Sequence, residues 1–343
     1  MGWGWRWGSP WATGSEVTQL RLQWRPFRFA LPQPLSTARG TIRHKRGWLL
    51  RLEEPAGRLG WGEAAPLELP GPAAWLEAAA SIESLGPAMP RQQLDDWLAR
   101  SSGSPSVGFA LGAALAELDG LLGGDDWLAA PPSAALLPAG EPMLQALERL
   151  LEGRPSAAGP LTLKWKVAAA DDGLERHLLD TMLQRLPRDA RLRLDANGGW
   201  GRATAEAWAD RLAQEPRLEW LEQPLDPHDL EGLTALAERL PVALDESLQA
   251  QPALRRSWGG WQVRRPSQEG DPRPLLAELR AGRPRLMLST GFETGVGGRW
   301  LQHLAGLQAR GPTPTAPGLA PGWLPREPLF AADPLVPWMA CHA

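Results

Sequence analysis

Several residue types that carry common chemistries are scarce in this chain. Only one cysteine, Cys341, is present among 343 residues, which excludes an intrachain disulfide and fits a reducing cytoplasm. None of the five histidines shows the spacing of a zinc site, and no apolar run approaches the ~20 residues of a membrane-spanning helix. With 22% charged residues and a formal net charge of −3, the chain lacks the basic excess of proteins that bind nucleic acid or membrane surfaces. We therefore expect a cytoplasmic protein without nucleic-acid or membrane partners, and its oligomeric state stays open.

The chain divides by pattern into three parts. Residues 1–16 are rich in Gly and Trp without the apolar core of a signal peptide, and we expect them to form a disordered extension. Residues 17–130 have the pattern of strands followed by helices, including a helix at 73–85, which is typical of an α+β module. Residues 131–319 alternate short apolar strands with amphipathic helices. We expect the Pro-rich end of the chain, 320–343, to return to the first module and complete it.

Six short strands of the second part each end at a polar residue. The predicted ends are Lys166, Asp195, Glu222, Asp245, Arg265 and Ser289. Regular β/α units favour a parallel barrel over an open sheet, although their spacing alone allows both. Because a barrel brings consecutive strand ends together at one mouth, these side chains are expected to share a pocket.

Two lysines occupy the end of the first of these strands. Lys164 and Lys166 lie two residues apart and share a face, while Trp165 is expected to point to the helix layer. Neighbouring ammonium groups lower each other's proton affinity, which makes a better base near neutral pH. Such a pair alone is more often two solvated lysines. The carboxylates at the equivalent positions that follow make a shared pocket the better interpretation.

Three carboxylates follow at the ends of the next strands. A lone Asp in the sequences DAN or DES is more often a turn or cap residue than a ligand. Glu222 is different, because a Glu that ends a buried apolar strand needs a cation. With Asp195 and Asp245 it supplies three oxygen donors, which suit Mg²⁺. Arg193 shares the strand face of Asp195, so it could form an ion pair inside the barrel or contact an anionic substrate.

The ordered motifs KxK, DxN, E-Q-P and D-E-S resemble the enolase superfamily in its muconate-lactonising branch. The stretches WGEAAPL, PLSTARG and RLMLSTGFETGVG are most similar to the o-succinylbenzoate synthase family of that branch. The resemblance covers nearly all of residues 17–343. It implies an α/β fold class, a modified (β/α) TIM-type barrel with an N-terminal α+β capping domain.

The resemblance also implies a metal centre. Asp195, Glu222 and Asp245 would bind Mg²⁺, or Mn²⁺ in its place, and the metal would hold a substrate carboxylate and stabilise an enediolate. Asn197 and Glu246 would support the metal site from behind.

Lys166 would be the general base, a pairing with Mg²⁺ already established for enolase-superfamily sites. Lys164 and Arg265 would be further catalytic residues, and the loop that contains Thr37 and Arg39 would close over the pocket. The substrate, a small-molecule carboxylate, would contact Ser289, Thr290, Gly291, Arg193, Thr37 and Arg39.

Arg265 departs from the family pattern, which usually places a lysine before proline on that strand. Arginine stays protonated at neutral pH, so it cannot serve as the second base that racemisation needs. Dehydration needs only one acid/base lysine, and an opposing cation can stabilise the anionic intermediate. The predicted function is therefore dehydration of 2-succinyl-6-hydroxy-2,4-cyclohexadiene-1-carboxylate to o-succinylbenzoate, in menaquinone or phylloquinone biosynthesis. The alternatives are a cycloisomerase, N-acylamino-acid racemase or dipeptide epimerase of the same branch, and a metal-binding relic without activity.

Overall fold

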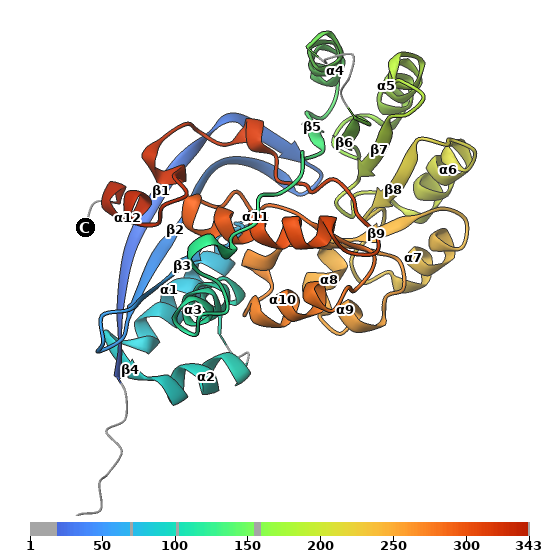
Figure 1. Ribbon diagram of the computed structural model, residues 1–343. Helices are drawn as coiled ribbons and strands as arrows, with labels where there is room; N and C mark the ends of the chain where they lie inside the picture. The colour runs from blue at the N-terminus through green and yellow to red at the C-terminus, as the bar shows by residue number, and fades with distance from the viewer. Residues whose placement is uncertain (1–18, 69–70, 101–102, 154–158, 342–343) are drawn as a thin grey trace, which may run out of the picture.

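The computed structural model describes residues 19–68, 71–100, 103–153 and 159–341, and the predicted extension at 1–16 lies outside them. Two sheets organise these residues (Figure 1). The first sheet is antiparallel, and its strands are β1 (Gln19–Thr37), β2 (Gly40–Glu53), β3 (Leu59–Ala64) and β4 (Ala88–Pro90), in the order β3-β2-β1-β4. Among all the residues that the structure describes, no helix combines the length and the apolar character that crossing a membrane requires.

Three helices cover one face of the first sheet. They are α1 (Ala73–Leu85), α2 (Arg91–Arg100) and α3 (Pro105–Leu118). Strand β3 lies directly on α3, because a Cβ at Gly60 or Gly62 would collide with a backbone carbonyl of that helix. Side chains alternate along a strand, so the two glycines leave Trp61 and Glu63 on the opposite face, toward the rest of the molecule.

The second sheet is parallel and has seven strands in the order β11-β10-β9-β8-β7-β6-β5. They are β5 (Ala135–Leu137), β6 (Thr162–Lys166), β7 (Arg191–Asp195), β8 (Leu218–Glu222), β9 (Val242–Leu244), β10 (Trp261–Arg264) and β11 (Leu286–Leu288). The segment around Pro317 and Gly318 joins its two edges. Gly318 N–H donates to the Leu288 carbonyl (2.8 Å), and Ala134 N–H donates to the Pro317 carbonyl (2.9 Å).

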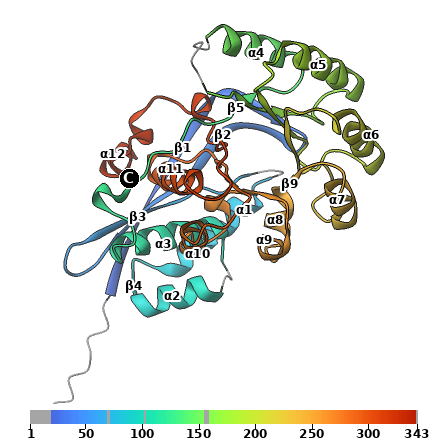
Figure 2. The same cartoon turned by 45° about the vertical axis from the view of Figure 1, so that its right-hand side comes forward.

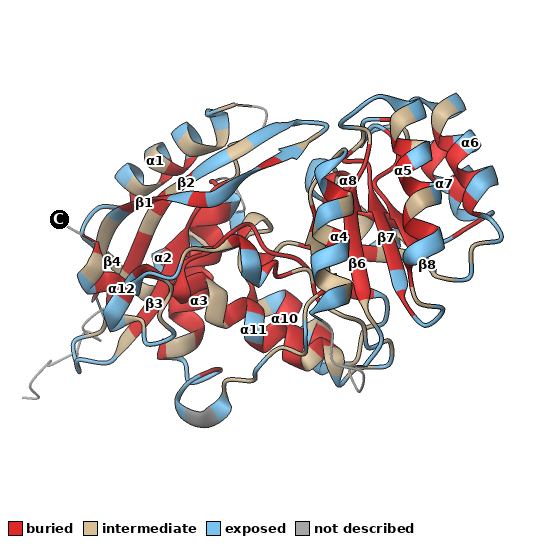
Figure 3. Cartoon of the chain, turned by 90° about the horizontal axis from the view of Figure 1, so that it is seen from above, coloured by how far each residue is buried: buried red, intermediate tan, exposed pale blue. Residues whose placement is uncertain are grey.

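Helices follow the strands along the outside of this sheet (Figure 2). They are α4 (Pro142–Glu152), α5 (Asp172–Arg185), α6 (Arg202–Leu212), α7 (Leu230–Ala237), α8 (Glu246–Ala250), α9 (Leu254–Ser257), α10 (Arg273–Arg280) and α11 (Gly295–Ala309). The strands are buried and the outward helix faces are exposed (Figure 3).

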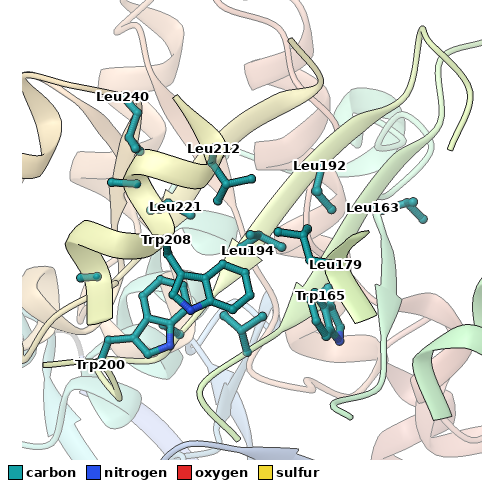
Figure 4. Packing of buried hydrophobic residues seen from close by; sticks show 14 of the residues in the cluster. Leu163, Trp165, Leu179, Leu192, Leu194, Trp200, Trp208, Leu212, Leu221 and Leu240 are labelled. Atoms are coloured by element: carbon teal, nitrogen blue, oxygen red, sulfur yellow. The ribbon is translucent and has the colours of Figure 1, made fainter. Parts of the chain in front are cut away.

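The largest apolar cluster lies between β6–β9 and their helices. Trp165 is completely buried in this cluster together with Leu179 and Trp208, as expected for a side chain that points to the helix layer (Figure 4). Trp208 stacks on Trp200, with ring centroids 4.9 Å apart. Since alternate residues point inward, a separate apolar cluster around Trp220 fills the inside of the barrel.

The α/β barrel with an N-terminal antiparallel sheet confirms the predicted fold class. Three predicted strand ends, Asp245, Arg265 and Ser289, lie one residue beyond the strands themselves.

The predicted loop over the pocket is the tip of the β1–β2 hairpin. Thr37 pairs with Gly40, and only Ala38 and Arg39 form the turn. Figure 3 shows this hairpin reaching from the first sheet toward the parallel sheet. The Ala38 methyl group lies against Gly199, in the loop after β7.

The last helix, α12 (Leu335–Ala340), packs against the first sheet. Trp338 meets Trp61 edge to face at 5.6 Å, and the Arg25 guanidinium lies 4.4 Å above the Trp338 ring. The domain boundaries themselves stay predictions.

Candidate functional site

A cavity of about 330 Å³ lies between the carboxyl ends of the parallel strands and the first module. Nine of the predicted site residues line it: Thr37, Arg39, Lys164, Lys166, Asn197, Glu246, Arg265, Ser289 and Thr290. Arg193 and Gly291 do not. The three predicted metal ligands lie directly behind the lining, at most 1% exposed.

Strand register brings the charged side chains together. Lys166 pairs with Asp195 across β6 and β7, and Asp195 pairs with Glu222 across β7 and β8. Glu222 pairs with Ala243 on β9, two residues before Asp245. Because the strands are parallel and end together, side chains from distant parts of the sequence meet at one edge.

The two lysines are held by the carboxylates. Lys164 Nζ lies 2.7 Å from Asp195 Oδ2 and 2.5 Å from Glu222 Oε1, and Lys166 Nζ lies 2.5 Å from Asp195 Oδ2. Lys166 also donates to Asn197 Oδ1 (2.9 Å). Burial would raise the pKa of Asp195, but the two ammonium groups hold it well below its usual range.

The expectation that the lysines lower each other's pKa is wrong for Lys164. Burial favours its neutral form, but the charges of Asp195 and Glu222 outweigh burial and raise the pKa of Lys164. Lys164 is therefore a fixed positive charge within the cavity wall.

Arg265 is held by Asp245 and by the backbone. Its Nε lies 2.9 Å from both carboxylate oxygens of Asp245, and its Nη2 lies 2.5 Å from Oδ2. Its Nη1 donates to the Thr290 carbonyl (2.6 Å). Burial lowers the pKa of Arg265, but Asp245 more than offsets burial, so the pKa is raised. This guanidinium cannot accept a proton from a substrate.

The carboxylate oxygens of Asp195, Glu222 and Asp245 are the kind of ligand that a hard divalent cation prefers. Burial, together with the charge of Asp195, raises the pKa of Glu222 to about 7. Burial and the charge of Asp245 do the same for Glu246, whose pKa also reaches about 7. A divalent cation would relieve this crowding of carboxylate oxygens.

The side-chain positions differ from those of a metal-bound site. Among the described residues, no three acidic, His or Cys side chains stand close enough to hold a metal ion, because Asp195, Glu222 and Asp245 each turn to a lysine or an arginine. Metal binding would therefore exchange these cationic partners.

Arg193 occupies the first of the two roles that the sequence left open. It is completely buried, and its Nε donates to Glu219 Oε2 (2.7 Å) while its Nη2 donates to Thr315 Oγ1 (2.7 Å). Its guanidinium lies 4.1 Å from the Trp220 ring centroid. Arg193 forms an ion pair inside the barrel and has no access to the cavity.

In the turn after β11, most polar groups form hydrogen bonds with other groups of the protein. Glu293 accepts hydrogen bonds from the Thr290 hydroxyl (2.6 Å) and the Gly291 N–H (2.7 Å), and from Ser267 Oγ (2.5 Å). These donors are not free to bind a substrate carboxylate. Of the predicted trio, Ser289 keeps a hydroxyl that lines the cavity.

Glu63 connects the first module to the barrel at the same place. Its carboxylate accepts from Thr294 N–H (3.0 Å), Thr294 Oγ1 (2.5 Å) and Gly297 N–H (2.9 Å) at the start of α11. A carboxylate at a helix N-terminus satisfies free N–H groups and complements the helix dipole. The buried Glu63 thereby holds the turn that precedes α11.

Several residues of the cavity were not predicted from the sequence. Ser104 and Ser106, both buried at the start of α3, share a hydrogen bond of 3.1 Å, and Gln249 lines the cavity from α8. Gln268 also lines it and bridges the two modules, since its Nε2 donates to the Ala65 carbonyl (3.0 Å). Ser104 and Pro105, the N-cap and the first residue of α3, are a sequence pattern typical of a helix start, but no sequence signal placed them beside the barrel.

Comparison with known proteins identifies relatives of this chain. The family model described as "Enolase C-terminal domain-like" matches residues 146–257. The o-succinylbenzoate synthase of Thermosynechococcus vestitus is 33% identical over 299 residues, which cover 83% of this chain and 88% of the relative. That of Edwardsiella ictaluri is 29% identical over 329 residues, covering 92% and 93%.

Solved structures give the same result. The o-succinylbenzoate synthase of Thermosynechococcus elongatus, complexed with Mg in the active site, superposes with a TM-score of 0.73 at 29% identity, covering 93% of this chain and 99% of that one. A dipeptide epimerase of Enterococcus faecalis reaches a TM-score of 0.71 at 22% identity, covering 91% and 93%, which shows a common fold. The chain therefore belongs to the o-succinylbenzoate synthase family of the enolase superfamily.

Proposed function

We propose that the chain catalyses the Mg²⁺-dependent dehydration of 2-succinyl-6-hydroxy-2,4-cyclohexadiene-1-carboxylate to o-succinylbenzoate, a step of menaquinone or phylloquinone biosynthesis. The observation that carries the proposal is that Lys166 and the permanently charged Arg265 line the same cavity, and Arg265 cannot act as a second base. One acid/base group suits an elimination, whereas racemisation needs two. The names of the relatives support the same reaction.

Lys166 would do the proton transfer. Its amine would take the proton from the ring carbon that bears the carboxylate, and the electron pair of that C–H bond would form the new ring double bond. The C–O bond at the adjacent ring carbon would break, and Lys166 would return the proton to the departing hydroxyl, so that substrate becomes product plus water.

The surrounding charges would stabilise the anionic ring system. Mg²⁺ held by Asp195, Glu222 and Asp245, or Mn²⁺ in its place, would supply positive charge beside the substrate carboxylate. Lys164 and Arg265 would add positive charge at the cavity lining, and the guanidinium of Arg265 would stay protonated at neutral pH whatever its partner.

The second carboxylate of the substrate would lie toward the hairpin tip. Arg39 lines the cavity there and is 38% exposed in its side chain, with Nη1 3.9 Å from Glu246 Oε1. Ser289 would add a hydroxyl donor from the opposite wall. A cytoplasmic location of this reaction stays a prediction, based on the single cysteine of the chain.

The direct test is to incubate purified protein with Mg²⁺ and the cyclohexadiene substrate and to follow o-succinylbenzoate by chromatography. We expect conversion that stops when the metal is chelated and resumes when Mg²⁺ is restored, and that Lys166→Ala abolishes. Absence of conversion by the Mg²⁺-loaded protein would overturn the proposal. Racemisation of an N-acylamino acid or dipeptide in deuterated water, with exchange at the α-carbon, would assign the chain to a two-base reaction instead.

A further inference from the structure

Two motif residues take no part in the proposed chemistry, Gln223 of E-Q-P and Ser247 of D-E-S. Both are completely buried. We infer that Gln223 is a positioning residue that sets the mutual geometry of Asp195, Glu222 and Asp245. The inference rests on the proposed metal site and explains how the ends of three separate strands hold their carboxylates in register.

The side-chain amide of Gln223 binds the loop that carries Asp245. Its Oε1 accepts from the Asp245 N–H (3.1 Å) and the Ser247 N–H (3.0 Å). Its Nε2 donates to Ser247 Oγ (2.8 Å) and to the Leu225 carbonyl (3.0 Å). A primary amide offers two donors and two lone pairs, so this side chain is fully used. Ser247 Oγ in turn donates to the Pro227 carbonyl (3.0 Å).

The backbone of Gln223 binds the other neighbouring loop. Its carbonyl accepts from Gly198 N–H (2.7 Å), three residues after Asp195, and its own N–H donates to the Ala243 carbonyl on β9 (2.8 Å). Glu222 precedes it directly. One residue therefore contacts the loops of all three carboxylates.

The backbone conformation of Gln223 shows that this arrangement is constrained. Its φ of +39° lies in the left-handed region, which is uncommon for a residue other than glycine. Such a conformation persists only where the surroundings hold it, and here the four side-chain hydrogen bonds do so. A simple turn would place glycine or asparagine at this position.

The four hydrogen bonds of the Gln223 side chain cannot all be reproduced by a carboxylate or by an apolar side chain of the same size. Methionine keeps the volume and removes all four hydrogen bonds. The chain offers a matched control in Gln262 on β10, a buried glutamine whose Nε2 donates only to the carbonyls of Arg255 and Trp258. Among the described residues, these hydrogen bonds of the Gln262 side chain go to the segment before β10 and not to the segments that carry the three carboxylates.

Titration calorimetry with MgCl₂ on the full chain tests the inference. We expect Gln223→Met to weaken Mg²⁺ binding by about 10–100-fold, the range for residues that orient metal ligands, and Gln262→Met to bind like the wild type. Because Gln223 acts through metal geometry, saturating Mg²⁺ should restore most of the kcat of Gln223→Met, which loss of folding would not allow. Ser247→Ala, which removes one partner of the amide, should weaken Mg²⁺ binding by about 3–10-fold.

The outcomes separate the two proposals. If the wild type binds Mg²⁺ and folded Gln223→Met binds it equally well, the positioning role is overturned while the proposed function stands. Should Gln223→Met fail to fold, unchanged Mg²⁺ affinity in Ser247→Ala overturns the positioning role. A wild-type chain that binds no Mg²⁺ overturns the proposed function and this inference together.

Discussion

The two walls of the cavity use polar groups in opposite ways. On the barrel wall, at the ends of β6–β9, charged groups pair with one another across strand ends, as Lys166 does with Asp195. The other wall is formed by the turn after β11 and the first module. Its polar groups form hydrogen bonds within the protein, as Thr290 and Gly291 do with Glu293. On the barrel wall, a metal ion or a substrate can replace one partner of an ion pair. The other wall keeps its hydrogen bonds and so gives the cavity a fixed shape.

The largest expected effect lies on the barrel wall. Lys166→Ala should lower kcat by ~10³-fold or more, because positioned acid/base groups contribute on the order of 10²–10⁴-fold. Steady-state kinetics measure it, and Mg²⁺ affinity by calorimetry serves as the control for an intact site. Retention of a tenth of the wild-type kcat would remove Lys166 from the role of base.

The second largest expected effect is on the free energy of unfolding, through Glu63 on the other wall. Burial, opposed by hydrogen bonds from Thr294, raises the pKa of Glu63 from 4.5 to about 7. The folded chain then binds this proton more tightly than the unfolded chain, so the stability contributed by Glu63 is present below pH 4.5 and is lost as the pH rises through about 7. The wild-type free energy of unfolding, relative to Glu63→Gln, should fall by roughly 3 kcal/mol over this range.

Denaturant unfolding of both proteins at several pH values gives that difference. A gap that stays constant with pH would show that Glu63 titrates normally in the folded chain. The same variant should keep a kcat within about threefold of the wild type, because only the shape of this wall depends on it.

Substitutions of Arg265 test whether its permanent positive charge takes part in the reaction, as the charged groups of the barrel wall do. Arg265→Met should lower kcat/KM by about 10–100-fold through loss of charge beside the reacting ring. Arg265→Lys keeps the charge and should remain within about tenfold of the wild type. Equal losses in both variants would mean that the bidentate contact with Asp245, and not the charge, is what matters.

The smallest effects separate neighbouring residues of the other wall. Ser289→Ala should raise KM by about 3–10-fold, the value of one hydrogen bond to the substrate. Thr290→Val should leave KM within about twofold and lower the free energy of unfolding by ~1 kcal/mol, because its hydroxyl serves Glu293. The reverse pattern in binding and melting experiments would place the substrate contact at Thr290.

The barrel wall could be predicted from the sequence because strand period and spacing constrain it. Residues two apart on a strand share a face, and parallel strands end at one edge, so Lys164, Lys166 and the three carboxylates had to be neighbours. The β/α pattern favoured a parallel barrel but also allowed an open sheet, and the resemblance to the enolase superfamily implied the fold class.

The other wall could not be predicted in this way. Which donors of the Ser289–Gly291 turn remain free depends on the rotamer of Glu293, and the approach of Glu63 depends on how two modules pack. Arg193 was ambiguous for a similar reason. Its partner Thr315 lies 122 residues away in the sequence, beyond any periodic signal.

We propose that Asp195, Glu222 and Asp245 act together as one metal site. Calorimetric titration of Mg²⁺ into the wild type and into Asp195→Asn, Glu222→Gln and Asp245→Asn tests it most directly. We expect one Mg²⁺ per wild-type chain and an affinity at least ~100-fold weaker in each variant. Wild-type affinity in any one of the three variants would contradict it.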